Sequence, residues 1–235
     1  MSTTKSTQRV ANARYAIVAV VVALVVIVGG YGLFRSSAID VSGDFVEGTH
    51  YKVIVGAAPV PAAGPIRVTE FFSYGCIHCR NFDPIVNDWN HDLPKDVVFE
   101  RSPVSFSNEW SVLAQAYFAL RDTNALEQNH ERIFKAIHDN HKDFTTPESI
   151  AEFVDGHGIT HDAFLTAFNS DTVVREVSEA SKRERTMHVN SVPTVDVADH
   201  YTIDMDKVPR KRVFDVVEFL IAKIRADRAA AKAAG

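Results

Sequence analysis

A strand-length apolar segment runs directly into two cysteines in Glu70-Phe71-Phe72-Ser73-Tyr74-Gly75-Cys76-Ile77-His78-Cys79. These are the only cysteines among the 235 residues. Two thiols at the Cys-x-x-Cys spacing can close a small disulfide ring. If a helix begins at Cys76, its free amides and the positive end of its dipole favour a thiolate there. The segment therefore predicts a dithiol that exchanges electrons with other proteins.

Four residues of this segment are the candidate catalytic groups. We expect Cys76 to be the nucleophile and Cys79, one helical turn deeper, to be the buried resolving thiol. His78, if cationic, adds a second attraction for the Cys76 thiolate. Glu70 interrupts an otherwise apolar strand, so burial would raise its pKa and let it relay the proton of Cys79. The plainer alternatives are that His78 only faces solvent and that Glu70 is a satisfied acid at a strand edge.

The direction of electron flow follows from the thiolate. Lowering the pKa of Cys76 by about four units would stabilise the reduced form by about 5 kcal/mol, or about 120 mV for a two-electron couple. A stabilised reduced form makes the disulfide a stronger oxidant. We therefore expect a donor of disulfides rather than a reductant.

The N-terminus predicts a membrane segment. Residues 15–34 carry no charge and, as a helix, would span about 30 Å, the thickness of a hydrocarbon core. Lys5, Arg9 and Arg14 precede them and would keep the N-terminus inside. The length of the run favours an uncleaved anchor over a cleaved signal peptide, and either places the remainder in an oxidising compartment. The net charge of −5 gives no basic surplus, and no nucleic-acid partner is expected.

The soluble part reads as an α/β sheet domain that is interrupted by helices. Apolar periodicity and turn residues predict strands at 51–55, 66–72, 97–101, 193–197 and 201–203. They predict helices at 76–90, 109–121, 125–139, 147–157, 161–169, 171–187 and 211–225. The chain divides into a signal or membrane anchor (1–35), a linker with an edge strand (36–65), the first part of the sheet domain (66–105), a helical insertion (106–188) and the second part of the sheet domain (189–228).

These residues resemble the DsbA-type thiol:disulfide oxidoreductases of the thioredoxin superfamily. Cys76-Ile77-His78-Cys79 is similar to the Cys-Pro-His-Cys centre of that family, and Val192-Pro193 to its pair of valine and cis-proline. The resemblance implies a thioredoxin-like fold with an inserted all-helical domain, behind one membrane-spanning helix. Ile77 and the pair Tyr74-Gly75 depart from the family pattern and leave the redox potential open.

The resemblance also implies a role and partners. The protein would oxidise cysteine pairs of reduced, unfolded exported proteins in the periplasm, using the Cys76–Cys79 disulfide and no separate cofactor. Val192 and Pro193 would bind a substrate strand through the backbone. A DsbB-like, quinone-linked membrane oxidase would restore the disulfide. The protein would be tethered to the inner membrane through residues 15–34, or be soluble in the periplasm if that segment is cleaved.

Alternatives to a disulfide donor stay open. A closed zinc site needs four ligands, and the chain has no second cysteine pair, so histidines would have to complete it. A static structural disulfide would explain the cysteines but not Glu70, His78 and Pro193 together. Within the same fold the activity could be that of an isomerase or a reductase. A different class is a membrane-tethered binding module with a structural or metal-bound dithiol.

Overall fold

The structure, a computed structural model, describes residues 45–234. The chain divides into two units, Met1–Gly43 and Asp44–Gly235, and the described residues all belong to the second. The membrane helix expected over 15–34 lies outside the described residues. Among residues 45–234, no helix combines the length and the apolar character needed to cross a membrane.

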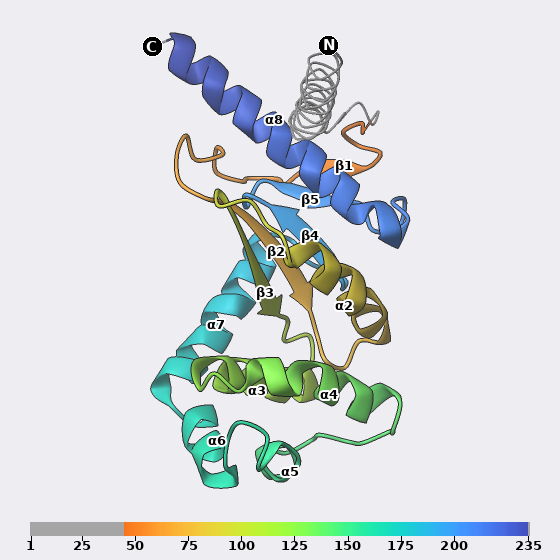
Figure 1. Cartoon of the computed structure of the whole chain (residues 1–235), viewed down its shortest axis with the longest axis vertical. Coiled ribbons are helices and arrows are strands. Elements are labelled where there is room, and N and C mark those ends of the chain that lie inside the picture. Colours follow the sequence, from red (N-terminus) through yellow and green to blue (C-terminus); the bar gives the residue numbers. More distant parts are fainter. Residues whose placement is uncertain (1–44, 235) are drawn as a thin grey trace, which may run out of the picture. The chain divides into compact units, whose positions relative to one another are not determined.

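The centre of the described part is a five-stranded sheet with the order β1-β5-β4-β2-β3 (Figure 1). The strands are β1 (Tyr51–Val53), β2 (Ile66–Phe72), β3 (Val97–Pro103), β4 (Thr194–Val197) and β5 (Tyr201–Ile203). The pair β2–β3 is parallel, and the other pairs are antiparallel. The register pairs Phe71 with Thr194, so the end of β2 lies beside the start of β4. This register brings the dithiol and the Pro193 turn to one end of the sheet.

Helix α2 (Ile77–Asn90) follows β2 and covers one face of the sheet together with α8 (Val213–Ala234). The two helices meet through aromatic rings, since Phe214 stacks on both Phe82 and Trp89 at centroid distances of 5.7 and 4.4 Å. The predicted helix over 76–90 is confirmed, and it continues through Pro84. The predicted end of the last helix at residue 225 is wrong, because α8 extends through the tail, where alanine, arginine and lysine favour a helix.

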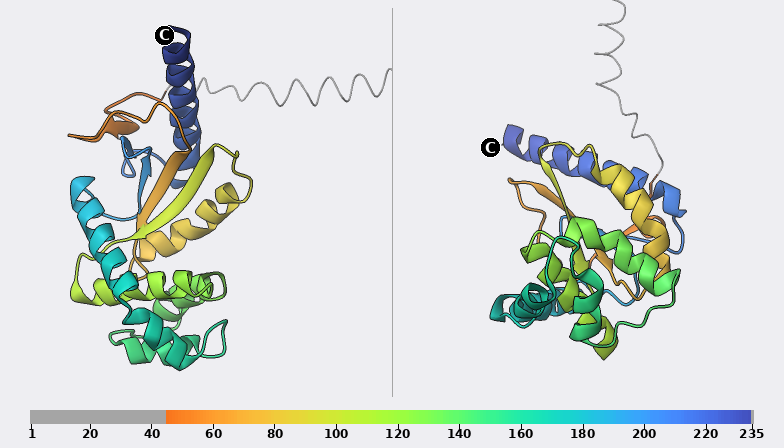
Figure 2. Two further views of the ribbon diagram at one scale, coloured as in Figure 1. Left: turned by 90° about the vertical axis from the view of Figure 1, so that its left-hand side faces the viewer. Right: turned by 60° about the horizontal axis from the view of Figure 1, so that its bottom comes forward.

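Five helices lie between β3 and β4 in the chain; the first four pack against one another below the sheet, and the last rises from them alongside it (Figures 1 and 2). They are α3 (Asn108–Asp122), α4 (Leu126–His138), α5 (Pro147–Val154), α6 (His161–Phe168) and α7 (Asp171–Thr186). Four of them begin at a hydroxyl side chain that accepts a backbone N–H; these are Ser107, Thr146, Thr160 and Ser170. The five predicted helices are thus confirmed, with ends shifted by a few residues.

Candidate functional site

The two thiols lie at the start of α2, where the chain leaves the sheet. Cys76 is the N-cap residue of the helix, and its Sγ accepts the backbone N–H of Cys79 at 3.2 Å. Both cysteines are in the thiol form. Cys79 is fully buried, whereas Cys76 retains a small exposed area. The expected division into an accessible thiol and a deeper thiol therefore has a structural basis.

The surroundings shift the pKa values of the two thiols in opposite directions. The pKa of Cys76 is lowered to about 7, chiefly by the hydrogen bond with the Cys79 thiol. The backbone N–H groups of Cys79 and His78 and the charge of Arg210 lower it further, while partial burial opposes them. Burial raises the pKa of Cys79, and the neighbouring Cys76 raises it again. One thiol of the pair thus ionises near neutral pH while the other holds its proton.

A second segment meets Cys76 from the start of β4. The Val192–Pro193 peptide bond is cis, as the resemblance implied. The Sγ of Cys76 lies 3.4 Å from the carbonyl oxygen of Val192, to which its thiol donates. The fold therefore places the substrate-binding candidates Val192 and Pro193 directly against the candidate nucleophile.

Glu70 lies on β2, an interior strand, and is only 2% exposed. Burial raises its pKa to about 7, although the charge of Arg101 acts in the opposite direction. Arg101 lies opposite Glu70 on β3 and donates from Nε to the Glu70 carboxylate at 3.0 Å. Its Nη2 donates to Asp83 at 2.7 Å. The acid is therefore paired inside the protein, and the strand-edge alternative does not apply.

The network beneath the dithiol continues into the helical insertion through His130 of α4. His130 Nε2 lies 3.1 Å from Asp83, and its Nδ1 lies 2.8 Å from the Tyr74 hydroxyl. Burial lowers the pKa of His130, so the neutral ring donates to Asp83 and accepts from Tyr74. Neither His130 nor Asp83 was among the sequence-based candidates. Asp83 had a local signal, because it follows Cys79 by one helical turn, but nothing near His130 in sequence marks it.

His78 differs from its expected role as a cation. Its side chain is exposed, and its Nδ1 lies 2.9 Å from Nη2 of Arg210. An arginine only donates hydrogen bonds, so Nδ1 must accept and the ring is neutral while this contact holds. Arg210 was not among the candidates; the basic run Arg210-Lys211-Arg212 was its only local signal.

The surface around Cys76 is apolar. Ile77 and Phe106 are exposed large hydrophobic residues, at 45% and 42% of their area, and Phe106 stacks on Trp110 with ring centroids 5.6 Å apart. The Trp110 ring also covers Gly75, where an added Cβ would come within 2.5 Å of its Nε1. Tyr74 is buried against the insertion.

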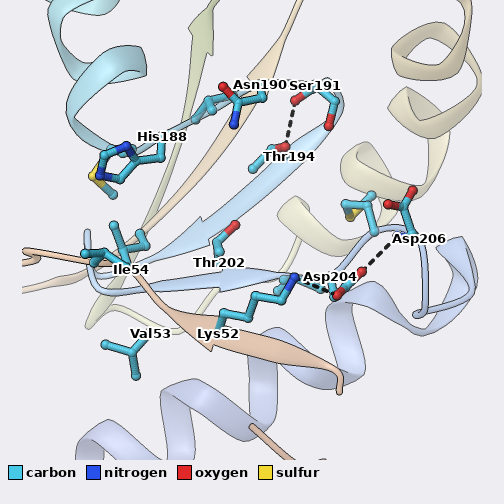
Figure 3. A pocket seen from close by; sticks show the side chains of 15 residues that line it. Lys52, Val53, Ile54, His188, Asn190, Ser191, Thr194, Thr202, Asp204 and Asp206 are labelled. Carbon is cyan, nitrogen blue, oxygen red and sulfur yellow. Dashed lines mark hydrogen bonds and ion pairs between the residues drawn. The ribbon is translucent and has the colours of Figure 1, made fainter. Parts of the chain in front are cut away.

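A pocket of about 500 Å³ lies between strand β1 and the segment that leads into β4 (Figure 3). Asn190, Ser191 and Thr194 line it on one side, and Lys52 of β1 lines it on the other, held by an ion pair with Asp204 at 3.0 Å. The pocket adjoins the segment that leads into Val192. It is thus a recess beside the Val192–Pro193 turn.

This arrangement defines the class of thiol:disulfide oxidoreductases. An accessible cysteine at a helix N-cap has a buried partner thiol, and a cis-proline turn faces it on a thioredoxin-like sheet. The chain belongs to the family of the DSBA-like thioredoxin domain, whose model matches residues 67–212.

Curated relatives bear a more particular name. "Thiol:disulfide interchange protein DsbA" of Pseudomonas aeruginosa is 34% identical over 190 residues, which are 80% of this chain and 89% of that protein. The protein of the same name from Azotobacter vinelandii is 36% identical over 183 residues, covering 77% of this chain and 86% of the relative. Disulfide exchange is therefore the activity of this family and of this chain.

Solved structures agree with the fold. The crystal structure of Pseudomonas aeruginosa DsbA matches with a TM-score of 0.73 at 33% identity, covering 81% of this chain and 98% of the other. The oxidoreductase DsbA from Xylella fastidiosa matches with a TM-score of 0.72 at 28% identity, covering 77% and 98%. The described sheet and insertion thus share their arrangement with DsbA proteins.

Proposed function

We propose that the protein is an oxidant, which donates the Cys76–Cys79 disulfide to cysteine pairs of exported proteins. The observation that carries this proposal is the opposite shift of the two thiols: the pKa of Cys76 lies at about 7, whereas burial raises that of Cys79. A thiolate that is stable in the reduced protein is a good leaving group in the mixed disulfide. Stabilising the reduced form drives electrons from the substrate to this protein.

The exchange takes two steps. A substrate thiolate attacks Sγ of Cys76, the Cys76–Cys79 bond breaks, and Cys79 leaves with the electron pair and takes up a proton. A second substrate thiolate then attacks the substrate sulfur of the mixed disulfide, and Cys76 leaves as a thiolate. The substrate gains a disulfide, and the protein gains the two electrons as a thiolate and a thiol.

Glu70 is the group that we assign to the proton of Cys79. It is buried beneath the dithiol, and its pKa of about 7 allows it to hold or release a proton near neutral pH. Arg101 fixes the Glu70 carboxylate in place through its Nε hydrogen bond, and Asp83 in turn holds the guanidinium of Arg101.

The substrate chain would pair with the backbone at Val192. Within residues 45–234 the Val192 N–H donates no hydrogen bond, and its carbonyl oxygen is met only by the Cys76 thiol. An extended peptide could use both groups, as in β-strand addition. The apolar surface formed by Ile77 and Phe106 suits unfolded chains, whose apolar side chains are not yet buried.

The place of action that fits this role is the periplasm, with residues 15–34 as a tether to the inner membrane. Reoxidation would come from a DsbB-like, quinone-linked membrane oxidase. Both statements rest on the family and on the uncharged run in the sequence.

The decisive experiment is the redox potential of the full-length protein, measured by equilibration with glutathione. We expect a potential well above that of the glutathione couple, which is the property of an oxidant. A potential below it would contradict the proposal and favour a reductase. Thiol counts with and without reductant, together with a zinc assay, would reveal a static or metal-bound dithiol.

A further inference from the structure

The side chain of Arg210 reaches the dithiol from a distant part of the chain. Arg210 opens the 3-10 turn η1 (Arg210–Arg212), which directly precedes α8 and packs against α2. Its Nη2 lies 2.9 Å from Nδ1 of His78, one of the two residues between the cysteines. Its positive charge also acts on Cys76.

The chemistry of the contact determines the state of the histidine. A guanidinium carries five N–H donors, no acceptor and a charge that persists at all relevant pH values. Nδ1 of His78 must therefore accept, which leaves the single ring proton on Nε2. In this arrangement the positive charge beside Cys76 belongs to the arginine, and the histidine is a neutral donor.

We propose that Arg210 is a positioning residue for this dithiol: it holds His78 as the neutral Nε2–H tautomer and itself supplies the cation that favours the Cys76 thiolate. The inference rests on the proposed oxidant function, and it adds the residue that tunes the thiol. An imidazolium would lose its charge as the pH rises through about 6.5, whereas a guanidinium would not. Thiolate stabilisation by Arg210 would therefore not depend on the ionisation of a histidine.

Three neighbouring groups do not supply this positive charge. Glu70 of β2 lies beneath the dithiol and is paired with Arg101. Cys79 of α2 holds its proton because it is buried. Arg212, two residues beyond Arg210, turns instead to Asp215 at 3.1 Å and lies over the ring of Phe45. Arg212 is therefore a matched control for the loss of a neighbouring positive charge.

The test compares R210Q, R210K and R210A with R212Q in the full-length, reduced protein. The rate of Cys76 alkylation as a function of pH reports the thiolate, and nitrogen NMR of His78 reports the tautomer. Glutamine keeps a donor for Nδ1 but loses the charge, so R210Q should keep the tautomer and lose about threefold in alkylation rate on the acid side of the titration. R210A should lose both the rate and the tautomer preference. R210K should keep most of the rate, and R212Q should behave as the wild type.

The outcomes separate this inference from the proposed function. If wild-type Cys76 ionises like free cysteine, the oxidant function itself fails. If wild-type Cys76 ionises early but R210A and R210Q titrate in the same way, only the role of Arg210 is overturned. A protonated Nδ1 on His78 in the wild type would also overturn it. Since Arg210 is exposed, the variants should fold, and circular dichroism will verify this.

Discussion

The two sides of the dithiol differ in how they control charge. On the rim, Cys76, His78 and Arg210 are close to solvent, and their interactions are weakened by water and salt. On the floor, Glu70 and Arg101 belong to a buried network that extends to His130 in the insertion. A buried charge of the floor that loses its partner strongly destabilises the fold, whereas a charge on the rim can be changed at little cost in stability. The rim should therefore govern reactivity, and the floor both reactivity and stability.

The largest expected effect is on the rim, at the nucleophile. C76S should abolish oxidation of a reduced test protein, because Cys79 would then have no partner cysteine in the chain with which to form the disulfide that is donated. Its unfolding free energy should change little, since oxygen replaces sulfur in the same N-cap position. The matched variant C79S should instead accumulate mixed disulfides with substrates, seen by non-reducing electrophoresis. Normal turnover in C76S would refute the assignment.

Removing the cation of the floor should mainly cost stability. R101M leaves Glu70 and Asp83 buried without their shared partner, which should destabilise the protein by roughly 3–5 kcal/mol in urea unfolding. The matched control R225M breaks the exposed ion pair with Asp96 and should cost no more than about 1 kcal/mol. Equal losses in the two variants would erase the proposed difference between buried and exposed charge.

The buried acid should also give the stability a pH dependence. The pKa of Glu70 rises from 4.5 to about 7 on folding, so the folded protein holds a proton that the unfolded chain has released. Stability should therefore fall as the pH rises from about 4.5 to 7, by on the order of 3 kcal/mol from this group.

Two variants isolate this contribution in urea titrations across that pH range. E70Q should flatten the slope. Asp196 lies on the other face of the sheet, and burial raises its pKa to about 8. It therefore also makes stability fall with rising pH, and D196N should remove a separate part of the pH dependence. An E70Q protein with the wild-type slope would show that Glu70 is ionised throughout.

The smallest expected effect is at the Tyr74–His130 contact, where the buried network meets the helical insertion. Y74F removes the hydroxyl that donates to His130 and leaves an aromatic ring of nearly the same shape. The loss of one buried hydrogen bond should cost about 1 kcal/mol in denaturant unfolding. Oxidation rates should stay close to wild type, because Arg101 still holds Glu70. A large loss of activity in Y74F would mean that the insertion influences the dithiol more strongly than this chain of contacts implies.

The elements that could be predicted from the sequence are those with a local cause. The apolar run of β2, the N-cap hydroxyls of the insertion helices and the Cys-x-x-Cys spacing are each contained within a few residues. Glu70 could be singled out for the same reason, since an acid inside an apolar strand is visible in the sequence. The state of His78 could not, because its partner Arg210 is 132 positions away.

By itself, then, the sequence determined the dithiol, the strand and helix that hold it, and the family resemblance that marked Val192 and Pro193. Only the tertiary structure decided which charges surround the thiols. The register of β2 and β3 sets Arg101 opposite Glu70, and the packing of α4 against α2 brings His130 to Asp83. Such pairs depend on how distant segments pack, and the free energy of a charge depends on its neighbours in space rather than along the chain.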